Sequence, residues 1–166
     1  MIPYDIYPLT NAQERVWFTQ TIFPNSSMFN IGGTATIQGE INVDILRLAF
    51  AWFVREHDAL RIRFTIRDGQ PFQYFCTEDE WDLSNIPFVD FRNNTNKEEN
   101  FAQWVKNLAV QPIFMEDMPL YRFAIFSIRP DQYGYLFLMH HILADGWSFQ
   151  MFTQEIQENY ELLSKF

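Results

Sequence analysis

Two apolar runs that flank a short turn constrain the fold of this chain more than any other feature. LYRFAIFSI (120–128) and YGYLFLMHH (133–141) predict two strands, and RPDQ between them predicts the turn that connects them. The second run ends on two histidines, and ILADG then leads into an amphipathic segment. We therefore expect a strand, a loop that carries adjacent histidines and a closing helix to follow one another here.

Helical patterns lie on both sides of these strands. Two capping boxes and one N-cap residue predict helices that begin after Thr10 (with Gln13), Asn42 and Thr95 (with Glu98). The second helix should end near REHD (55–58), and the third should cover residues 96–110. The closing helix is marked by an apolar stripe, with Glu155, Glu158 and Glu161 outside it: Phe149, Phe152, Ile156, Tyr160 and Leu163.

Strand patterns alternate with the helices. Residues 24–33 are typical of a loop, and TATIQGEI (34–41) alternates as a strand does. A further strand is expected to place Leu60, Ile62, Phe64 and Ile66 on one face and Arg61, Arg63, Thr65 and Arg67 on the other. Asp68-Gly69 then predicts a hairpin turn to QPFQYF, and IPFVDF adds a short strand. This pattern predicts an α/β class of fold: an α+β mixed sheet with helices packed on it, in one domain.

The composition excludes several kinds of function. The net charge of −9 argues against a nucleic-acid partner, because phosphate contacts need a basic patch. No segment is long and apolar enough to predict a membrane span, and no glycine-rich phosphate cradle predicts a nucleotide cofactor. Cys76 is the only cysteine and is expected to be a buried, inert thiol, so a reducing cytoplasm is the expected location. No signal peptide is visible at the start of the sequence.

The two histidines of the FLMHHILADGWSF stretch allow three interpretations. A strand that continues to its end points His140 and His141 to opposite faces, which disfavours a metal site built from this pair. In the structural interpretation one histidine is packed, Asp145 caps the closing helix and Gly146 permits the turn. In the catalytic interpretation an imidazole handles a proton near neutral pH. Because no nucleophile elbow surrounds Ser148, the catalytic interpretation favours acyl transfer to an external nucleophile.

The remaining histidine and the first helix are expected to be structural. His57 ends a helix, where an imidazolium interacts favourably with the helix dipole. Gln13 and Trp17 of the first helix are typical of capping and packing rather than chemistry.

Three segments resemble, in order, the motifs of condensation domains of nonribosomal peptide synthetases. HHILADG (140–146) is similar to His-His-x-x-x-Asp-Gly, a signature of the chloramphenicol acetyltransferase-like superfamily. LTNAQERVWF (9–18) resembles Ser-x-Ala-Gln-x-Arg-Leu-Trp-x-Leu, with Thr10 in place of Ser, Val16 in place of Leu and the next residue, Thr19, in place of the last Leu. EHDALRIRF (56–64) resembles Arg-His-Glu-x-Leu-Arg-Thr-x-Phe and departs from it at Glu56, Asp58 and Ile62.

The resemblance implies a fold and a set of roles. Residues 1–166 would form the N-terminal lobe of a two-lobed chloramphenicol acetyltransferase-like fold, with the C-terminal lobe absent. His141 is the expected catalytic or substrate-positioning residue, and His140 and Trp147 are expected to support the motif. Asp145 is expected to pair with Arg61 as a buried ion pair, and Gly146 to keep bulk away from the incoming nucleophile.

The reaction implied is amide formation between an acyl or peptidyl thioester and an aminoacyl thioester. Both substrates would arrive on phosphopantetheine arms of upstream and downstream peptidyl carrier proteins, beside an adenylation domain, so the lobe itself binds no cofactor and no metal. The amine needs no enzyme nucleophile, and holding two tethered substrates end to end supplies much of the rate. Whether His141 acts as a base or as a hydrogen-bonding positioner stays open. We expect the isolated chain to be inactive.

Alternatives to an elongating condensation domain remain. YPLTNAQ and FPNSSMFNIGG resemble starter condensation domains, which acylate the first amino acid with a fatty acyl group. Epimerization domains share the histidine motif, but their first motif typically lacks Ala-Gln-x-Arg. A free-standing CoA-dependent acyltransferase is disfavoured by the first two motifs. The non-enzymatic alternative is a condensation-like recruitment platform, which would need neither His141 nor Asp145.

Overall fold

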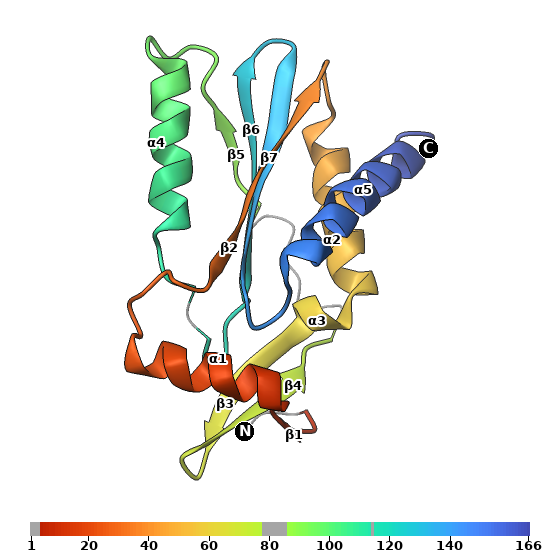
Figure 1. Cartoon of the computed structure of the whole chain (residues 1–166). Helices are drawn as coiled ribbons and strands as arrows, with labels where there is room; N and C mark the ends of the chain where they lie inside the picture. The colour runs from red at the N-terminus through yellow and green to blue at the C-terminus, as the bar shows by residue number, and fades with distance from the viewer. Residues whose placement is uncertain (1–3, 78–85, 114) are drawn as a thin grey trace.

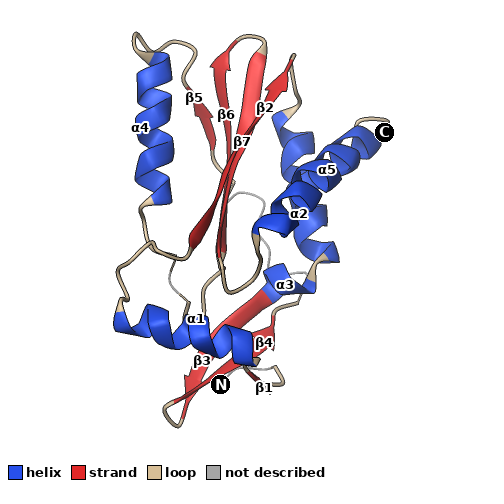
Figure 2. Cartoon of the chain, in the orientation of Figure 1, coloured by secondary structure: helices blue, strands red, loops and turns tan. Residues whose placement is uncertain are grey.

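The computed structural model describes residues 4–77, 86–113 and 115–166, which form two sheets and the helices that cover them (Figures 1 and 2). The helices are α1 (Asn11–Ile22), α2 (Val43–Glu56), α3 (Asp58–Arg61), α4 (Lys97–Ala109) and α5 (Gly146–Leu163). The strands are β1 (Tyr7–Pro8), β2 (Asn30–Gln38), β3 (Ile62–Arg67), β4 (Gln70–Phe75), β5 (Phe88–Asp90), β6 (Tyr121–Arg129) and β7 (Gln132–His140).

The larger sheet has the strand order β2-β7-β6-β5. β6 and β7 form the predicted antiparallel hairpin, and β2 pairs antiparallel with β7 along its whole length, from Asn30 opposite His140 to Gln38 opposite Gln132. β5 runs parallel to β6, which makes the sheet mixed, as predicted. β7 therefore lies between β2 and β6, so its backbone is held on both sides up to His140.

Helices cover both faces of this sheet, as Figure 2 shows. On one face, Phe137 and Met139 of β7 pack with residues of α2 and α5 in the largest apolar cluster. On the other face, Leu136 and Leu138 pack against α4. Alternate residues of β7 thus enter different clusters, which confirms the predicted division of its faces.

The smaller sheet, β1-β4-β3, packs beneath α1. The predicted capping box at Thr10 and Gln13 is present and begins α1. Trp17 of α1 is 5% exposed and lies against Phe64 of β3, with ring centroids 5.5 Å apart. Ile142 of the loop after β7 belongs to the same apolar cluster. Trp17 is therefore a packing residue, as expected, and the cluster ties α1 to the loop that carries the histidines.

Several boundaries differ from those predicted. The strand expected from Leu60 begins at Ile62, because Asp58–Arg61 forms the short helix α3 after an extended His57. β2 starts at Asn30, inside the predicted loop. α4 has Asn96 as its N-cap, with no side-chain cap hydrogen bond, rather than Thr95.

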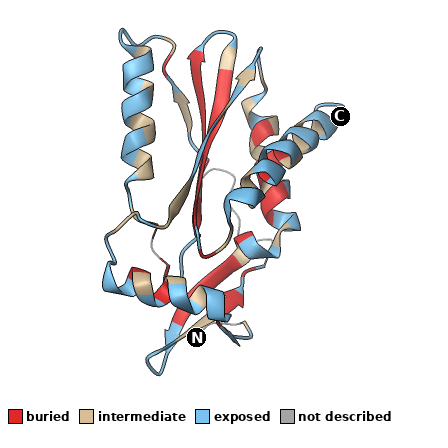
Figure 3. Cartoon of the chain, in the orientation of Figure 1, coloured by how far each residue is buried: buried red, intermediate tan, exposed pale blue. Residues whose placement is uncertain are grey.

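The polar face expected for β3 is also wrong over most of its length (Figure 3). Arg63 and Thr65 are buried, at 8% and 3% exposed. The guanidinium of Arg63 donates to the carbonyl oxygens of Leu60 and Ile62 at 3.2 and 2.8 Å. α3 leaves these carbonyls free at its end, and they satisfy a cation that the alternation alone would place in solvent.

Candidate active site

The two histidines lie at a corner where the backbone leaves the sheet. β7 ends at His140, residues 141–145 form the loop, and α5 begins at Gly146. The strand therefore stops one residue earlier than predicted, and His141 belongs to the loop. The corner separates the two imidazoles by burial, because His140 is 1% exposed and His141 is exposed.

His140 is a neutral, hydrogen-bonded core residue. The amide N–H of Ile142 donates to its Nδ1 at 3.2 Å, and its Nε2 donates to Oε1 of Gln20 at 3.3 Å. Burial lowers the pKa of His140 to about 4, and the neighbouring His141 adds to the shift. His140 thus matches the packed histidine of the structural interpretation.

His141 is held by two hydrogen bonds, and its Nε2 has no hydrogen-bond partner among the residues that the structure describes. Its backbone N–H donates to the carbonyl of Phe29 at 2.8 Å, and its Nδ1 lies 2.7 Å from the carbonyl oxygen of Ala144. A carbonyl oxygen only accepts, so Nδ1 carries the proton in this arrangement. In the neutral imidazole Nε2 then keeps its lone pair, and it can accept a hydrogen bond or a proton.

Asp145 begins α5. Its carboxylate accepts from the backbone N–H and the hydroxyl of Ser148 at 3.1 and 3.0 Å, and its own N–H lies 3.4 Å from the Ser148 hydroxyl oxygen. The hydrogen bonds from Ser148, the backbone one first, keep the pKa of Asp145 below its usual range. The predicted cap is therefore present.

The expected ion pair between Arg61 and Asp145 is not formed. Arg61 pairs instead with Asp58, one turn earlier in α3, and donates to the carbonyl of Cys76 at 3.2 Å. The physical reason is local: α3 brings Asp58 and Arg61 to the same face at a spacing of three residues, and the cap of α5 occupies Asp145.

Gly146 and Trp147 are the two remaining residues of the predicted motif. A Cβ on Gly146 would meet no atom within 4 Å, so the described part of the chain contains nothing that requires glycine there. The indole of Trp147 is 75% exposed. Space is therefore open at Gly146, and most of the Trp147 side chain lies in solvent.

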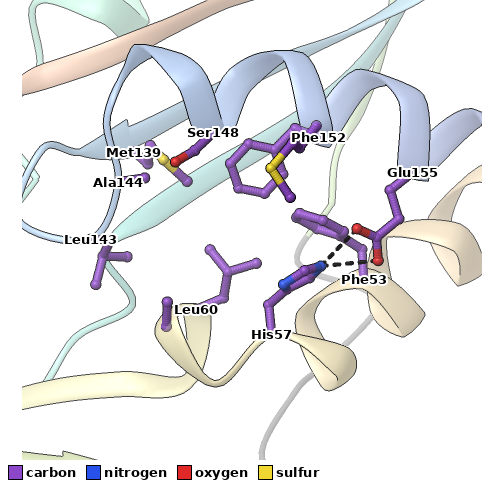
Figure 4. Close-up of a pocket in the computed structure, with 11 residues that line it drawn as sticks. Phe53, His57, Leu60, Met139, Leu143, Ala144, Ser148, Phe152 and Glu155 are labelled. Carbon is purple, nitrogen blue, oxygen red and sulfur yellow. Dashed lines mark hydrogen bonds and ion pairs between the residues drawn. The ribbon is translucent and has the colours of Figure 1, made fainter.

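Next to the corner lies a small apolar pocket, shown in Figure 4. Its volume is about 130 Å³, and it is lined by Leu143 and Ala144 of the loop, by α5 and by the α2–α3 junction. At one side, His57 Nε2 lies 2.9 and 2.8 Å from the two carboxylate oxygens of Glu155. Glu155 was expected outside the apolar stripe and in fact borders it, because it lies one helical turn from Phe152, a buried residue of that stripe.

Gln20, which contacts His140, was not among the residues that the sequence patterns selected. Its side chain is 4% exposed although it lies in a helix that exposes Phe18 and Ile22. The apolar residues of α1 surround the helix, so their spacing does not define an inner face. The sequence signal that could have indicated the burial of Gln20 was its place midway between two apolar residues, Phe18 and Ile22.

Within residues 4–77, 86–113 and 115–166, no three His, Cys, Asp or Glu side chains gather as metal ligands would. No helix in the same ranges is long and apolar enough to cross a membrane.

Known proteins resemble the chain over nearly its whole length. The condensation domain family model matches residues 4–165. One of the proteins that make up the linear gramicidin synthase of Brevibacillus parabrevis is 32% identical over 98% of the chain, which spans 2% of that protein. Gramicidin S synthase 2 of Aneurinibacillus migulanus is 30% identical over 96% of the chain, which spans 3% of that protein.

A solved structure shows the same fold. The starter condensation domain of the rhizomide synthetase RzmA superposes with a TM-score of 0.89 at 25% identity, over 97% of this chain and 38% of that chain. The α/β fold class and the resemblance to condensation domains are thereby confirmed. The chain belongs to the condensation domain family.

Proposed function

We propose that this chain is the N-terminal lobe of a nonribosomal peptide synthetase condensation domain and that His141 contributes to amide formation. The observation that carries the proposal is the hydrogen bond from His141 Nδ1 to the Ala144 carbonyl, which leaves Nε2 as the free acceptor on an exposed corner. The share of the solved starter domain that the chain covers, 38%, supports a second lobe beyond these residues.

In the proposed reaction an amine attacks a thioester carbonyl. A carbon–nitrogen bond forms, the carbon–sulfur bond breaks, the thiol leaves and the amine gives up a proton. His141 Nε2 accepts a hydrogen bond from the attacking N–H, as a base or as a positioner. The open space at Gly146 would admit the amine beside Nε2. Carrier proteins would deliver both substrates on phosphopantetheine arms, with an adenylation domain as neighbour, and the lobe itself would need no cofactor.

The test uses the domain with both lobes, donor and acceptor carriers loaded, and peptide-bond formation as the readout. His141→Ala should lower the rate by about 10² to 10⁴, the usual contribution of a general base. His57→Gln is the matched control, because His57 lies outside the corner and pairs with Glu155; it should change the rate by less than about tenfold. Unchanged activity in His141→Ala would contradict the role of His141, whereas no peptide bond even in the wild-type domain would favour the recruitment platform. The 166-residue chain alone should form no peptide bond.

A pH–rate profile separates the two roles of His141. A base requires a limb near the pH at which an imidazole titrates, whereas a positioner that only accepts a hydrogen bond does not. The profile is measured at saturating carriers, so that binding does not contribute to the limb.

The starter subtype is the second candidate, and the structural likeness to the starter condensation domain of the rhizomide synthetase favours it. Its donor would be a fatty acyl thioester rather than a peptidyl or aminoacyl one. The assay above distinguishes the two when the donor carrier is loaded with an octanoyl group in one arm and with an aminoacyl group in the other. Turnover of the aminoacyl donor with no turnover of the octanoyl donor would exclude the starter role.

A further inference from the structure

Gln20 occupies a position in α1 that burial alone does not explain. Its side chain is 4% exposed, whereas Phe18 and Ile22 of the same helix are 52% and 71% exposed. Burying an amide costs free energy unless its hydrogen bonds are all made. Because Gln20 is buried while Phe18 of the same helix is exposed, we expect the buried amide to make hydrogen bonds that stabilise the fold.

The partners of Gln20 fix the orientation of its amide. Nε2 donates to the carbonyl oxygens of Phe23 and Ser26 at 2.7 and 3.0 Å. The reverse orientation would face an oxygen to two carbonyl oxygens, so Oε1 is the atom that faces His140. Because Oε1 only accepts, Nε2 of His140 must carry the proton. His140 Nδ1 is then the acceptor that the amide N–H of Ile142 finds at 3.2 Å.

The same amide fixes the loop that holds His141 from the other side. Gln20 donates to two carbonyls of residues 23–29, and Phe29 at the end of that loop accepts the backbone N–H of His141. Gln20 thus contacts both groups that hold the backbone around His141. The N–H of His141 donates to Phe29 of the 23–29 loop, and the N–H of Ile142 donates to the imidazole of His140.

We propose that Gln20 is a positioning residue for His141: it selects the tautomer of His140 and anchors the 23–29 loop, and so fixes the backbone from which His141 presents Nε2. The effect of this positioning on the reaction rests on the proposed function of His141. The structural coupling of Gln20 to His140 and His141 is independent of that function. Gln20 touches no reacting atom and acts through its neighbours.

The experiment is a long-range ¹H–¹⁵N NMR spectrum of the 166-residue chain, which contains three histidines. In the wild type we expect His140 protonated at Nε2 and His141 protonated at Nδ1. Gln20→Leu keeps the bulk and removes all three hydrogen bonds. The Nε2–H to Nδ1–H ratio of His140 should fall roughly fivefold to tenfold, the equivalent of one neutral hydrogen bond. The Nδ1–H fraction of His141 should fall with it.

Gln13→Leu is the matched control. Gln13 lies on the same helix and also makes amide hydrogen bonds, to Gln73 and to the N–H of Thr10, but at the far end from the corner. It should leave both tautomer ratios unchanged. Wild-type tautomers at His140 and His141 in folded Gln20→Leu would overturn the proposal, and so would a wild-type His140 protonated at Nδ1.

Gln20→Glu keeps the proposal testable if the leucine variant does not fold. It places a carboxylate against His140 and should raise the pH at which His140 titrates in the same spectrum; an unchanged titration would contradict the contact. In the two-lobed domain, Gln20→Leu should lower kcat about tenfold and change KM little. If His141→Ala keeps full activity while the tautomers respond to Gln20, the proposed function fails and the positioning inference stands.

Discussion

The helix layer of α2 and α5 and the corner of residues 140–145 meet at the start of α5, yet different forces hold them. In the layer, Phe152 lies 4.4 Å from Phe53 and 4.3 Å from Phe137, measured between ring centroids. In the corner, His141 is exposed and is held by two hydrogen bonds to carbonyl oxygens. Burial is not directional, whereas a hydrogen bond is. The layer therefore supplies stability, and the corner supplies a direction for one imidazole.

Removing a ring from the layer should have the largest effect on stability. Phe152→Ala leaves a cavity among Phe53, Phe137 and Ile156 and should lower the free energy of unfolding by about 3–5 kcal/mol. Denaturant unfolding measures the loss. Leu162→Ala, on an exposed part of the same helix, is the control and should stay within about 0.5 kcal/mol. A loss below about 1 kcal/mol in Phe152→Ala would show that the layer is not the main source of stability.

Acid should act on the corner through its buried histidine. The unfolded chain binds a proton at His140 near pH 6.5, whereas the folded chain binds it only near the pKa of about 4. Stability is therefore complete above about pH 7 and falls as the pH drops through 6.5 to 4, by about 3 kcal/mol. Unfolding at a series of pH values in wild type and His140→Gln measures the difference. An equal pH dependence in both proteins would contradict the assignment.

Sequence patterns predicted the layer better than the corner. The alternation in β7 and the stripe from Phe149 to Tyr160 describe apolar residues that burial sorts by period, and the structure confirms both. Asn42 and Thr10 were also predictable, because an N-cap acts on its own helix.

Contacts between segments far apart in the sequence were not predictable in the same way. Gln20 reaches His140 across 120 residues, and His57 reaches Glu155 across 98. The sequence period of a helix or strand predicts which residues share a face of that element, and it carries no information about a partner in a distant element. The prediction of an ion pair between Arg61 and Asp145 was wrong for a related reason. The family resemblance implied a distant partner, whereas the structure pairs Arg61 with Asp58, three residues earlier in the same helical turn.

The contact between His57 and Glu155, an ion pair when the imidazole is protonated, lies beside the pocket between the two regions and should contribute little. The side chains of His57 and Glu155 are 35% and 30% exposed, so water screens their attraction. Glu155→Gln should lower the free energy of unfolding by less than about 1 kcal/mol, and about 1 M salt should shrink the difference. Glu158→Gln is the control, because Glu158 accepts a hydrogen bond from Gln154 of the same helix. A loss of about 3 kcal/mol or more, as for a buried pair, would place this contact with the layer instead.

His141→Ala should have the smallest effect on stability, in contrast to its neighbour. The exposed imidazole buries little area and makes one side-chain hydrogen bond, so the free energy of unfolding should change by no more than about 0.5 kcal/mol. His140→Ala removes a buried ring and strands the amide oxygen of Gln20, and should cost about 1–3 kcal/mol. Chemical unfolding of both variants decides the matter. Equal losses would mean that the two imidazoles are both structural. A stable His141→Ala variant would instead show that His141 is not needed for folding, which favours a chemical role for its oriented imidazole.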